Sequence, residues 1–154
     1  MGKKKEKRQW RSGCPLNASV EMLGDRWSLL LIRDMMLRGA TTFKDFLGGF
    51  ENIATNVLAD RLRRLESFGV IEKRKDAYDG RKTHYELTQK GIDLAPVLTE
   101  MVLWAAEHEN TENPRLVALM KKDRKVFETR IREEWEKRRK DGKQKRENGK
   151  QERR

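Results

Sequence analysis

The sequence is poor in cysteine, proline and histidine, and it has no long apolar run. Cys14 is the only cysteine among 154 residues, so a single chain can form neither an internal disulfide nor a cysteine-based metal site. The longest apolar stretch, Leu29 to Ile32, is far too short to cross a bilayer. The basic N-terminus is not followed by the apolar segment of a secretory signal. We therefore expect a cytoplasmic protein with no membrane partner.

Residue patterns typical of enzyme active sites are also scarce. The two histidines, His84 and His108, lie far apart in the sequence, and neither has a recognisable nucleophile motif or metal-ligand spacing around it. Gly48 and Gly49 lack the lysine and the spacing of a phosphate-binding loop. We expect no catalytic residue, no metal and no cofactor, and hence a protein that is not an enzyme.

Charge of both signs is abundant, but the net excess lies at the two ends. Residues 1–11 carry six Lys/Arg and one acid, a net +5, and residues 137–154 carry ten and three, a net +7. The whole chain carries +11, so the remaining body is nearly neutral. Because the ends have almost no apolar side chains to bury, we expect residues 1–12 and 137–154 to be disordered tails. Such tails can bind a polyanion such as nucleic acid. They are equally well explained as solvated segments that aid solubility.

Apolar spacing and capping residues predict four helices between the tails. The patterns cover residues 17–22, 26–38, 43–47 and 53–68, and Asn52 is the expected cap of the last of these helices. The third and fourth are joined by a short turn that contains glycine, and the fourth is longer and more basic. This arrangement is typical of a helix-turn-helix.

The periodicity then changes from that of a helix to that of a strand. Residues 70–75 and 83–88 read as two strands, and Asp79 and Gly80 between them form the turn signal of a hairpin. A basic hairpin directly after a helix-turn-helix predicts a winged helix. The expected fold is mainly α with a small β-wing, in the order α-α-α-α-β-β-α-α.

Two further helices are expected after the wing. One covers residues 89–109 with a kink at Pro96, and it completes a winged-helix domain over residues 13–109. The other is an additional amphipathic helix over residues 113–136. The first carries more apolar surface than so small a domain can bury, which predicts a dimer interface. Its expected residues are Leu98, Met101 and Trp104.

Five stretches of the chain, in this order, resemble HxlR-type winged-helix regulators, which are relatives of the MarR group. They are Cys-Pro-Leu-Asn at 14–17, the run 24–34, Thr-Phe-Lys-Asp-Phe at 42–46, the run 58–66 and Tyr-Glu-Leu-Thr-Gln-Lys-Gly at 85–91. The resemblance implies a homodimer held by terminal helices that binds a pseudo-palindromic operator, most often as a repressor. Arg26 stands where this family usually has lysine. The helix from Asn113 and the basic end lie beyond the resemblance, so their roles do not carry over.

The fourth helix is the expected DNA-reading element. Opposite its buried stripe lie Asn56 and Arg63, flanked by Thr55 and Arg64, and we expect the first three to read or position DNA and Arg64 to contact the backbone. For Arg61, a DNA contact and a structural ion pair are equally good interpretations. In the wing, the expected contacts to the minor groove or its phosphates come from Lys73, Arg81 and Lys82.

Cys14 admits two interpretations. It is either a small buried or incidental thiol, or a sensor whose thiolate is favoured by the basic stretch from Lys3 to Arg11. The family resemblance supports the interpretation as a sensor, because in some HxlR-type regulators the matching cysteine senses oxidants or electrophiles, often by bridging two subunits. One cysteine per chain allows only an intersubunit bond or an adduct.

The sequence thus predicts a DNA-binding transcription regulator that acts on double-stranded DNA as a homodimer, with a small-molecule or oxidant effector. The main alternative is a chromatin-like protein that binds nucleic acid without sequence preference through its basic tails. A third interpretation is a protein-interaction module, which would tolerate loss of Asn56 and Arg63.

Overall fold

The computed structural model describes residues 9–151, and its first half is built from short helices. These are α1 (Pro15–Leu23), α2 (Ser28–Arg33), the π-helical turn η1 (Asp34–Arg38), α3 (Phe43–Leu47) and α4 (Thr55–Ser67). Helix α3 starts at a capping box, in which the hydroxyl of Thr42 accepts from the N–H of Asp45 and the Asp45 carboxylate accepts from the N–H of Thr42. Gly39 ends η1 in the left-handed conformation, with φ of 66°.

Helix α4 begins two residues later than the sequence pattern indicated. Its cap position is Ala54, whereas Asn52, the expected cap, has a left-handed φ of 53°. Asparagine tolerates this conformation better than most residues, and the resulting bend places Ile53 in the core. The first exposed residues of α4 are therefore Thr55 and Asn56.

The wing is a two-stranded antiparallel hairpin of β1 (Ile71–Lys75) and β2 (Thr83–Leu87). The N–H of Tyr85 donates to the carbonyl of Thr41 at 2.7 Å, which fixes β2 to the linker before α3. The hairpin is therefore attached to the helix-turn-helix by a hydrogen bond as well as by the chain.

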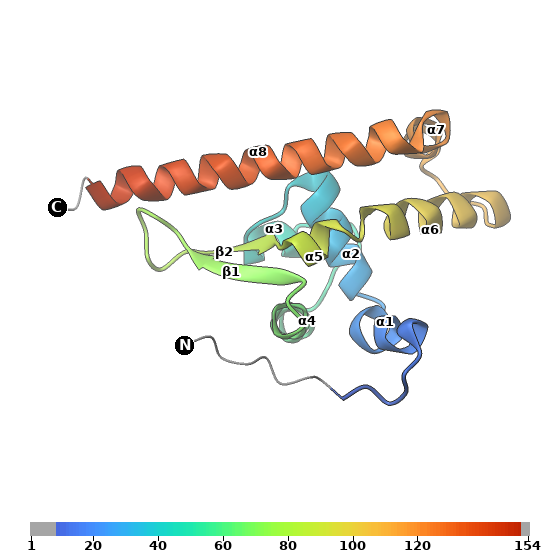
Figure 1. Cartoon of the computed structure of the whole chain (residues 1–154), viewed down its shortest axis with the longest axis horizontal. Helices are drawn as coiled ribbons and strands as arrows, with labels where there is room; N and C mark the ends of the chain where they lie inside the picture. The colour runs from blue at the N-terminus through green and yellow to red at the C-terminus, as the bar shows by residue number, and fades with distance from the viewer. Residues whose placement is uncertain (1–8, 152–154) are drawn as a thin grey trace.

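The C-terminal part contains α5 (Gln89–Ile92), α6 (Ala95–His108), α7 (Pro114–Lys122) and α8 (Arg124–Gln151). Figure 1 shows α8 lying along the molecule, over α6 at one end and over the hairpin at the other. The single helices expected over residues 89–109 and 113–136 are each divided. Pro96 stands in the first turn of α6, where its missing N–H is not needed, so the chain starts a new helix instead of kinking one.

The expectation of a disordered tail at residues 137–154 differs from the structure, in which α8 continues to Gln151. Ile131 is buried in the core, and the Trp135 indole donates to the carbonyl of Leu87 at 2.9 Å. These contacts anchor α8 near its middle, although the residues that follow Trp135 in the helix have few apolar groups. Residues 1–8 and 152–154 lie outside the described part, so the expectation for the N-terminal tail is not tested. Within residues 9–151, no helix is long and apolar enough to span a membrane.

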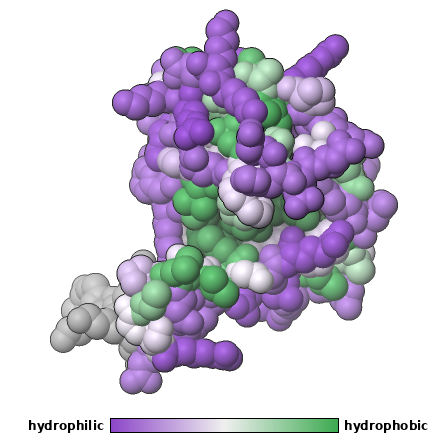
Figure 2. Space-filling view, turned by 90° about the vertical axis from the view of Figure 1, so that its right-hand side faces the viewer, coloured by the Kyte–Doolittle hydropathy of each residue, from purple (hydrophilic) through white to green (hydrophobic). Residues whose placement is uncertain are grey.

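One side of the molecule exposes apolar surface. Figure 2 looks at the end where α1, α6 and α7 lie and shows apolar atoms open between charged side chains. Helix α6 contributes Val97, Met101 and Trp104 at helical spacing, with Trp104 at 64% exposure. Exposed apolar surface of this kind marks an interaction face.

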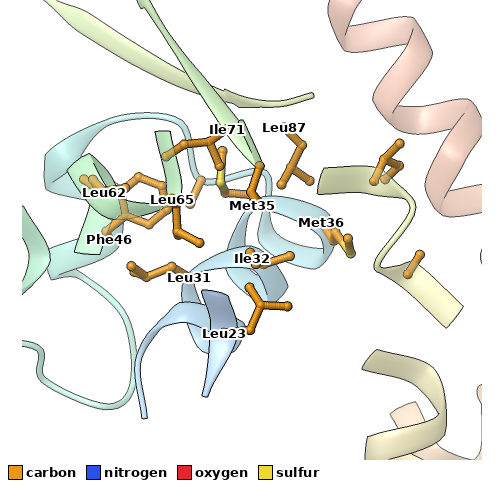
Figure 3. Close-up of a cluster of buried hydrophobic side chains, with 14 of the residues drawn as sticks. Leu23, Leu31, Ile32, Met35, Met36, Phe46, Leu62, Leu65, Ile71 and Leu87 are labelled. Carbon is orange, nitrogen blue, oxygen red and sulfur yellow. The ribbon is translucent and has the colours of Figure 1, made fainter. Parts of the chain in front are cut away.

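The core lies where α2, η1, α3 and α4 meet the base of the wing (Figure 3). Buried residues of α4 occur at every third or fourth position, as expected for one face of a helix. The largest fully buried side chains are Phe46, Ile32, Leu58, Leu62, Leu65, Ile71 and Ile92. This core fixes which face of α4 is turned outward. The mainly helical fold with a small antiparallel wing confirms the fold class expected from the sequence.

Candidate nucleic-acid interface

The outer face of α4 presents exposed polar side chains. Thr55 and Asn56 are exposed in the first turn, and the Arg63 side chain is 76% exposed two turns later. The Arg63 guanidinium lies 3.9 Å from Asp60, a long and solvent-screened ion pair. These three side chains are available to a ligand that covers the outer face of α4.

Two other arginines of α4 are engaged within the domain. Arg61 forms an ion pair with Asp25 at 3.3 Å, and Asp25 accepts from the N–H groups of Trp27 and Ser28 at the start of α2. This geometry favours the structural interpretation of Arg61. Hydrogen bonds from Ser28 and these N–H groups, with the nearby Arg61, lower the pKa of Asp25 although burial opposes them.

Arg64 is likewise tied to the body of the protein. Its guanidinium donates to the carbonyl of Glu21 in α1 and lies 5.3 Å from the ring centre of Phe68. Arg64 therefore joins α4 to α1. A DNA phosphate could bind its guanidinium only alongside, or in place of, the hydrogen bond to Glu21.

The wing tip is shaped by Asp76. Its carboxylate accepts from the N–H groups of Tyr78 and Asp79, both at 2.9 Å, and from His84 Nε2 at 2.9 Å. These bonds lower the pKa of Asp76 to about 2, so the carboxylate stays ionised at neutral pH. His84, whose other ring nitrogen lies 3.4 Å from Thr41, thus has a structural role in the wing. Within the described residues, no group of acidic, His or Cys side chains could hold a metal ion.

The tip holds Arg81 and Lys82 outward. The Arg81 side chain is 93% exposed and forms an ion pair with Asp79 at 3.2 Å, while Lys82 and Lys73 are also exposed. Arg74 in the same hairpin is different, because its guanidinium pairs with Glu72 and lies 3.2 Å from Glu86. The hydrogen bond from Arg74 to Glu72 raises the pKa of Arg74 against an opposing effect of burial.

A cleft of about 360 Å³ lies between the wing and α8. Met35, Tyr85 and Trp135 contribute to its apolar lining, and Arg138 and Arg146 are at its edge. No local sequence pattern points to this cleft, because it forms only where the stretch from Arg138 to Arg146, which composition predicts to be part of a disordered tail, packs against the wing. Its volume falls within the range of small-molecule sites.

The HxlR-like helix-turn-helix family model matches residues 22–113, more than half of the chain. The chain belongs to this family. Its expected identification is confirmed, and the matched segment covers the helix-turn-helix, the wing and α6.

Named relatives of this HxlR-like protein are transcriptional regulators. YvaP of Bacillus subtilis is 34% identical over 95 residues, 61% of this chain and 87% of the relative. YodB of the same organism is 33% identical over 93 residues, 60% of this chain and 82% of the relative. Both are named as HTH-type transcriptional regulators.

Solved structures support the same assignment. Reduced YodB matches with a TM-score of 0.52 and 32% identity, covering 63% of this chain and 95% of YodB. The redox regulator HypR in its oxidised form matches with a TM-score of 0.56 and 25% identity, covering 64% of this chain and all of HypR. This HxlR-like chain is thus longer than either neighbour's matched structure.

The residues expected at a dimer interface do not share one environment in this HxlR-like protein. Met101 and Trp104 are exposed on α6, whereas Leu98 is partly buried and packs against the core. Leu16 and Val20 of α1 are also exposed apolar residues, which the sequence interpretation did not single out. The exposed members are the ones available to a second chain.

Cys14 is exposed and immediately precedes α1. Its carbonyl accepts from the N–H of Ala18 at 3.1 Å, so the residue is held at the start of the helix. The interpretation of Cys14 as a buried hydrophobe is therefore wrong. The adjacent stretch from Lys3 lies mostly outside the described residues.

Proposed function

We propose that this protein is a sequence-specific transcription regulator, a repressor that binds a pseudo-palindromic operator in double-stranded DNA as a homodimer. The observation that supports this most directly is the open outer face of α4, with Thr55, Asn56 and Arg63, next to a wing that holds Arg81 outward. The ion pairs of Arg63 with Asp60 at 3.9 Å and of Arg81 with Asp79 at 3.2 Å lie at the surface, so both arginines can exchange these partners for DNA.

The side chains match the chemistry of DNA grooves. An asparagine can pair with the N6 and N7 atoms of adenine, and an arginine with the O6 and N7 atoms of guanine. Asn56 and Arg63 are the candidates for these pairings, while Thr55 can bind a phosphate or contact a thymine methyl. Arg81 reaches the minor groove or its phosphates from the wing.

Two copies joined through α6 would present two such faces. Dimeric helix-turn-helix proteins bind half-sites about 10 bp apart, one turn of DNA. The exposed Met101 and Trp104 supply the apolar contact that such a dimer requires. Because access to chromosomal DNA is needed, we expect a cytoplasmic protein, and the regulator function leaves no task for a catalytic site.

Selection of binding sites from random duplex DNA tests this function. The full-length chain should enrich an inverted repeat, and the Asn56→Ala, Arg63→Ala double variant should lose that enrichment while it keeps its folded spectrum. Binding without any enriched sequence would instead support the chromatin-like alternative, and retention of an operator by the double variant would reject the proposed reading face.

Arg81→Ala tests the wing. We expect weaker binding to every sequence and a salt dependence of log K whose slope falls by about 1, because a phosphate contact is lost and fewer counterions are released. Arg115→Ala, which removes an exposed arginine from α7, is the matched control and should leave the slope unchanged. An unchanged slope for Arg81→Ala would remove the wing from the interface.

We further propose that Cys14 senses oxidants or electrophiles. It is exposed, and structures of the relative YodB include reduced, diamide-treated and quinone-bound forms. In a homodimer, two Cys14 thiols can be oxidised to one intersubunit disulfide, with the two electrons and two protons taken by an oxidant such as diamide. The cleft under α8 offers a second place for a small-molecule effector.

Non-reducing electrophoresis tests the thiol. Diamide should give a band at twice the 18.2 kDa chain mass, and dithiothreitol should remove it. Cys14→Ser should give no such band and should bind the operator equally well with and without diamide. If the wild-type chain forms neither the band nor an adduct, Cys14 is not the sensor.

A further inference from the structure

The two halves of α8 differ sharply in charge. Residues 124–136 carry four basic and four acidic side chains, a net charge of zero. Residues 137–147 carry seven basic and two acidic side chains, a net +5. The change comes at Lys137, two residues after Trp135, which anchors α8 beside the base of the wing. The charged half is therefore the part that extends along the hairpin (Figure 1).

The arginines of this charged half are turned toward the protein. Arg138 donates to the carbonyls of Met35 and Met36, both at 3.3 Å. Arg139 lies 3.8 Å from Glu72 in β1, and Arg146 lies 3.8 Å from Glu86 in β2. These bonds hold α8 against the wing instead of leaving it free in solvent.

Most lysines of the same segment are turned away from the wing, although Lys145 also lines the cleft between α8 and the wing. Lys137, Lys140, Lys143 and Lys145 are all exposed, and within the described residues none has a carboxylate at ion-pair distance. Lysine is a strongly hydrated point charge suited to phosphate, whereas arginine makes the planar multiple bonds seen toward the wing. The division between the two residue types indicates that docking uses the arginines and leaves the lysine charge for another partner.

The far end of α8 meets the wing tip. A Cβ on Gly149 would lie 3.4 Å from the Tyr78 ring and 3.5 Å from Ala77, so the helix passes in contact with the turn that carries Arg81. Residues 137–147 span about 15 Å at the helical rise of 1.5 Å per residue. This segment is therefore long enough to lie along roughly half a turn of the DNA duplex next to the part that the wing contacts.

The charge of the family segment shows why such an element matters. Residues 22–113 carry 13 basic and 15 acidic side chains, a net −2, which gives no overall attraction to a polyanion. We propose that the exposed lysines of residues 137–145 form a second DNA-binding element, which binds phosphates of the duplex flanking the operator outside the wing. This inference rests on the proposed function, because it places α8 next to a wing that contacts DNA.

A charge-matched pair of variants tests the inference in the full-length dimer. The wing-side variant is K137Q/K140Q/K143Q/K145Q, and the control is K121Q/K122Q/K125Q/R130Q, which removes the same charge from the end of α7 and the start of α8. Affinity for the selected operator is measured against salt, on one duplex with long flanks and on one trimmed just outside the wing contact. Circular dichroism checks that both variants keep α8.

The wing-side variant should lose about 10- to 100-fold in affinity on the long duplex, and its salt slope should fall by about 2–4, because each lost phosphate contact removes about 0.9. On the trimmed duplex the wing-side variant should have the affinity and salt slope of the wild type. The control variant should have the affinity and salt slope of the wild type on both duplexes. A wing-side variant with the wild-type slope on the long duplex, or equal losses in both variants, would overturn the inference.

Failure of the proposed function gives a different result. If selection enriches no operator, the sequence-specific regulator is rejected, and the same two variants are compared on an arbitrary duplex. A slope reduced only in the wing-side variant would still support α8 as a phosphate-binding element, and equal slopes would reject it.

Discussion

Gly91→Ala should destabilise the winged-helix domain by about 3 kcal/mol, a large part of the 5–15 kcal/mol typical of a domain. A Cβ at Gly91 would overlap the carbonyl oxygen of Val70 and would lie 2.9 Å from Cδ2 of Leu87. The first obstacle is backbone, so no rotamer change can relieve it. Either α5 or the start of the wing has to move.

The surrounding bonds make that movement costly. The Thr88 hydroxyl lies 2.6 Å from the carbonyl of Gly69, and its oxygen accepts from the N–H of Gly91 at 3.2 Å. The N–H of Thr88 donates to the carbonyl of Val70 at 3.1 Å. Helix α5 is thus fastened to the residues before β1 at the very place where the extra methyl group would push them apart.

Gly80→Ala is the matched control for this substitution. Gly80 has no positive φ, and a Cβ there would meet nothing within 4 Å. We expect its free energy of unfolding to stay within about 0.5 kcal/mol of the wild type. Urea unfolding followed by circular dichroism compares the two variants. Equal stability of both would show that α5 does not approach Val70 as closely as the structure indicates.

Gly91 also illustrates what the sequence could and could not predict. It closes the stretch from Tyr85 that resembles the HxlR family, but the resemblance does not explain why a glycine is needed there. The contact joins residues 21 positions apart, and no local pattern encodes it. By contrast, the start of α3 at Phe43 and the hairpin turn at Asp79 and Gly80 depend on neighbouring residues alone, and the sequence pattern predicts both correctly.

The arginines of α4 show the same limit within the candidate site. A helical wheel separates Arg63 from the buried stripe, but it gives no information about partners from other elements. Arg61 finds Asp25 before α2, and Arg64 finds the carbonyl of Glu21 in α1. Only the fold reveals that these two are engaged and that Arg63 is free to meet a ligand.

The C-terminal segment was predicted as disordered for a sound but incomplete reason. Its composition offers too little apolar surface to fold alone. The structure supplies partners that composition does not count, namely the wing carboxylates Glu72 and Glu86 and the open carbonyls that Arg138 reaches. A basic segment next to an acidic face can therefore be ordered by its own domain.

The second large effect is expected at the dimer interface. Met101→Glu combined with Trp104→Glu should give a monomer at micromolar concentration and should lower operator affinity by about 100-fold or more, since two buried carboxylates without partners oppose association. Met101 is 49% exposed and Trp104 64%, so neither substitution damages the core of the single chain. Leu98 is left unchanged because it packs inward. Sedimentation velocity and binding to full and half operators measure both effects.

The control replaces another exposed apolar pair, Leu119→Glu and Val126→Glu, on α7 and α8. It adds the same charge to apolar surface of similar exposure, so it should stay dimeric if α6 is the interface. Affinity of the Met101 and Trp104 variant for a half-site should equal that of the wild type, because the α4 face and the wing are unchanged. If instead the control dissociates and the α6 variant does not, the dimer forms through α7 and α8, and the spacing of the two α4 faces follows from that contact.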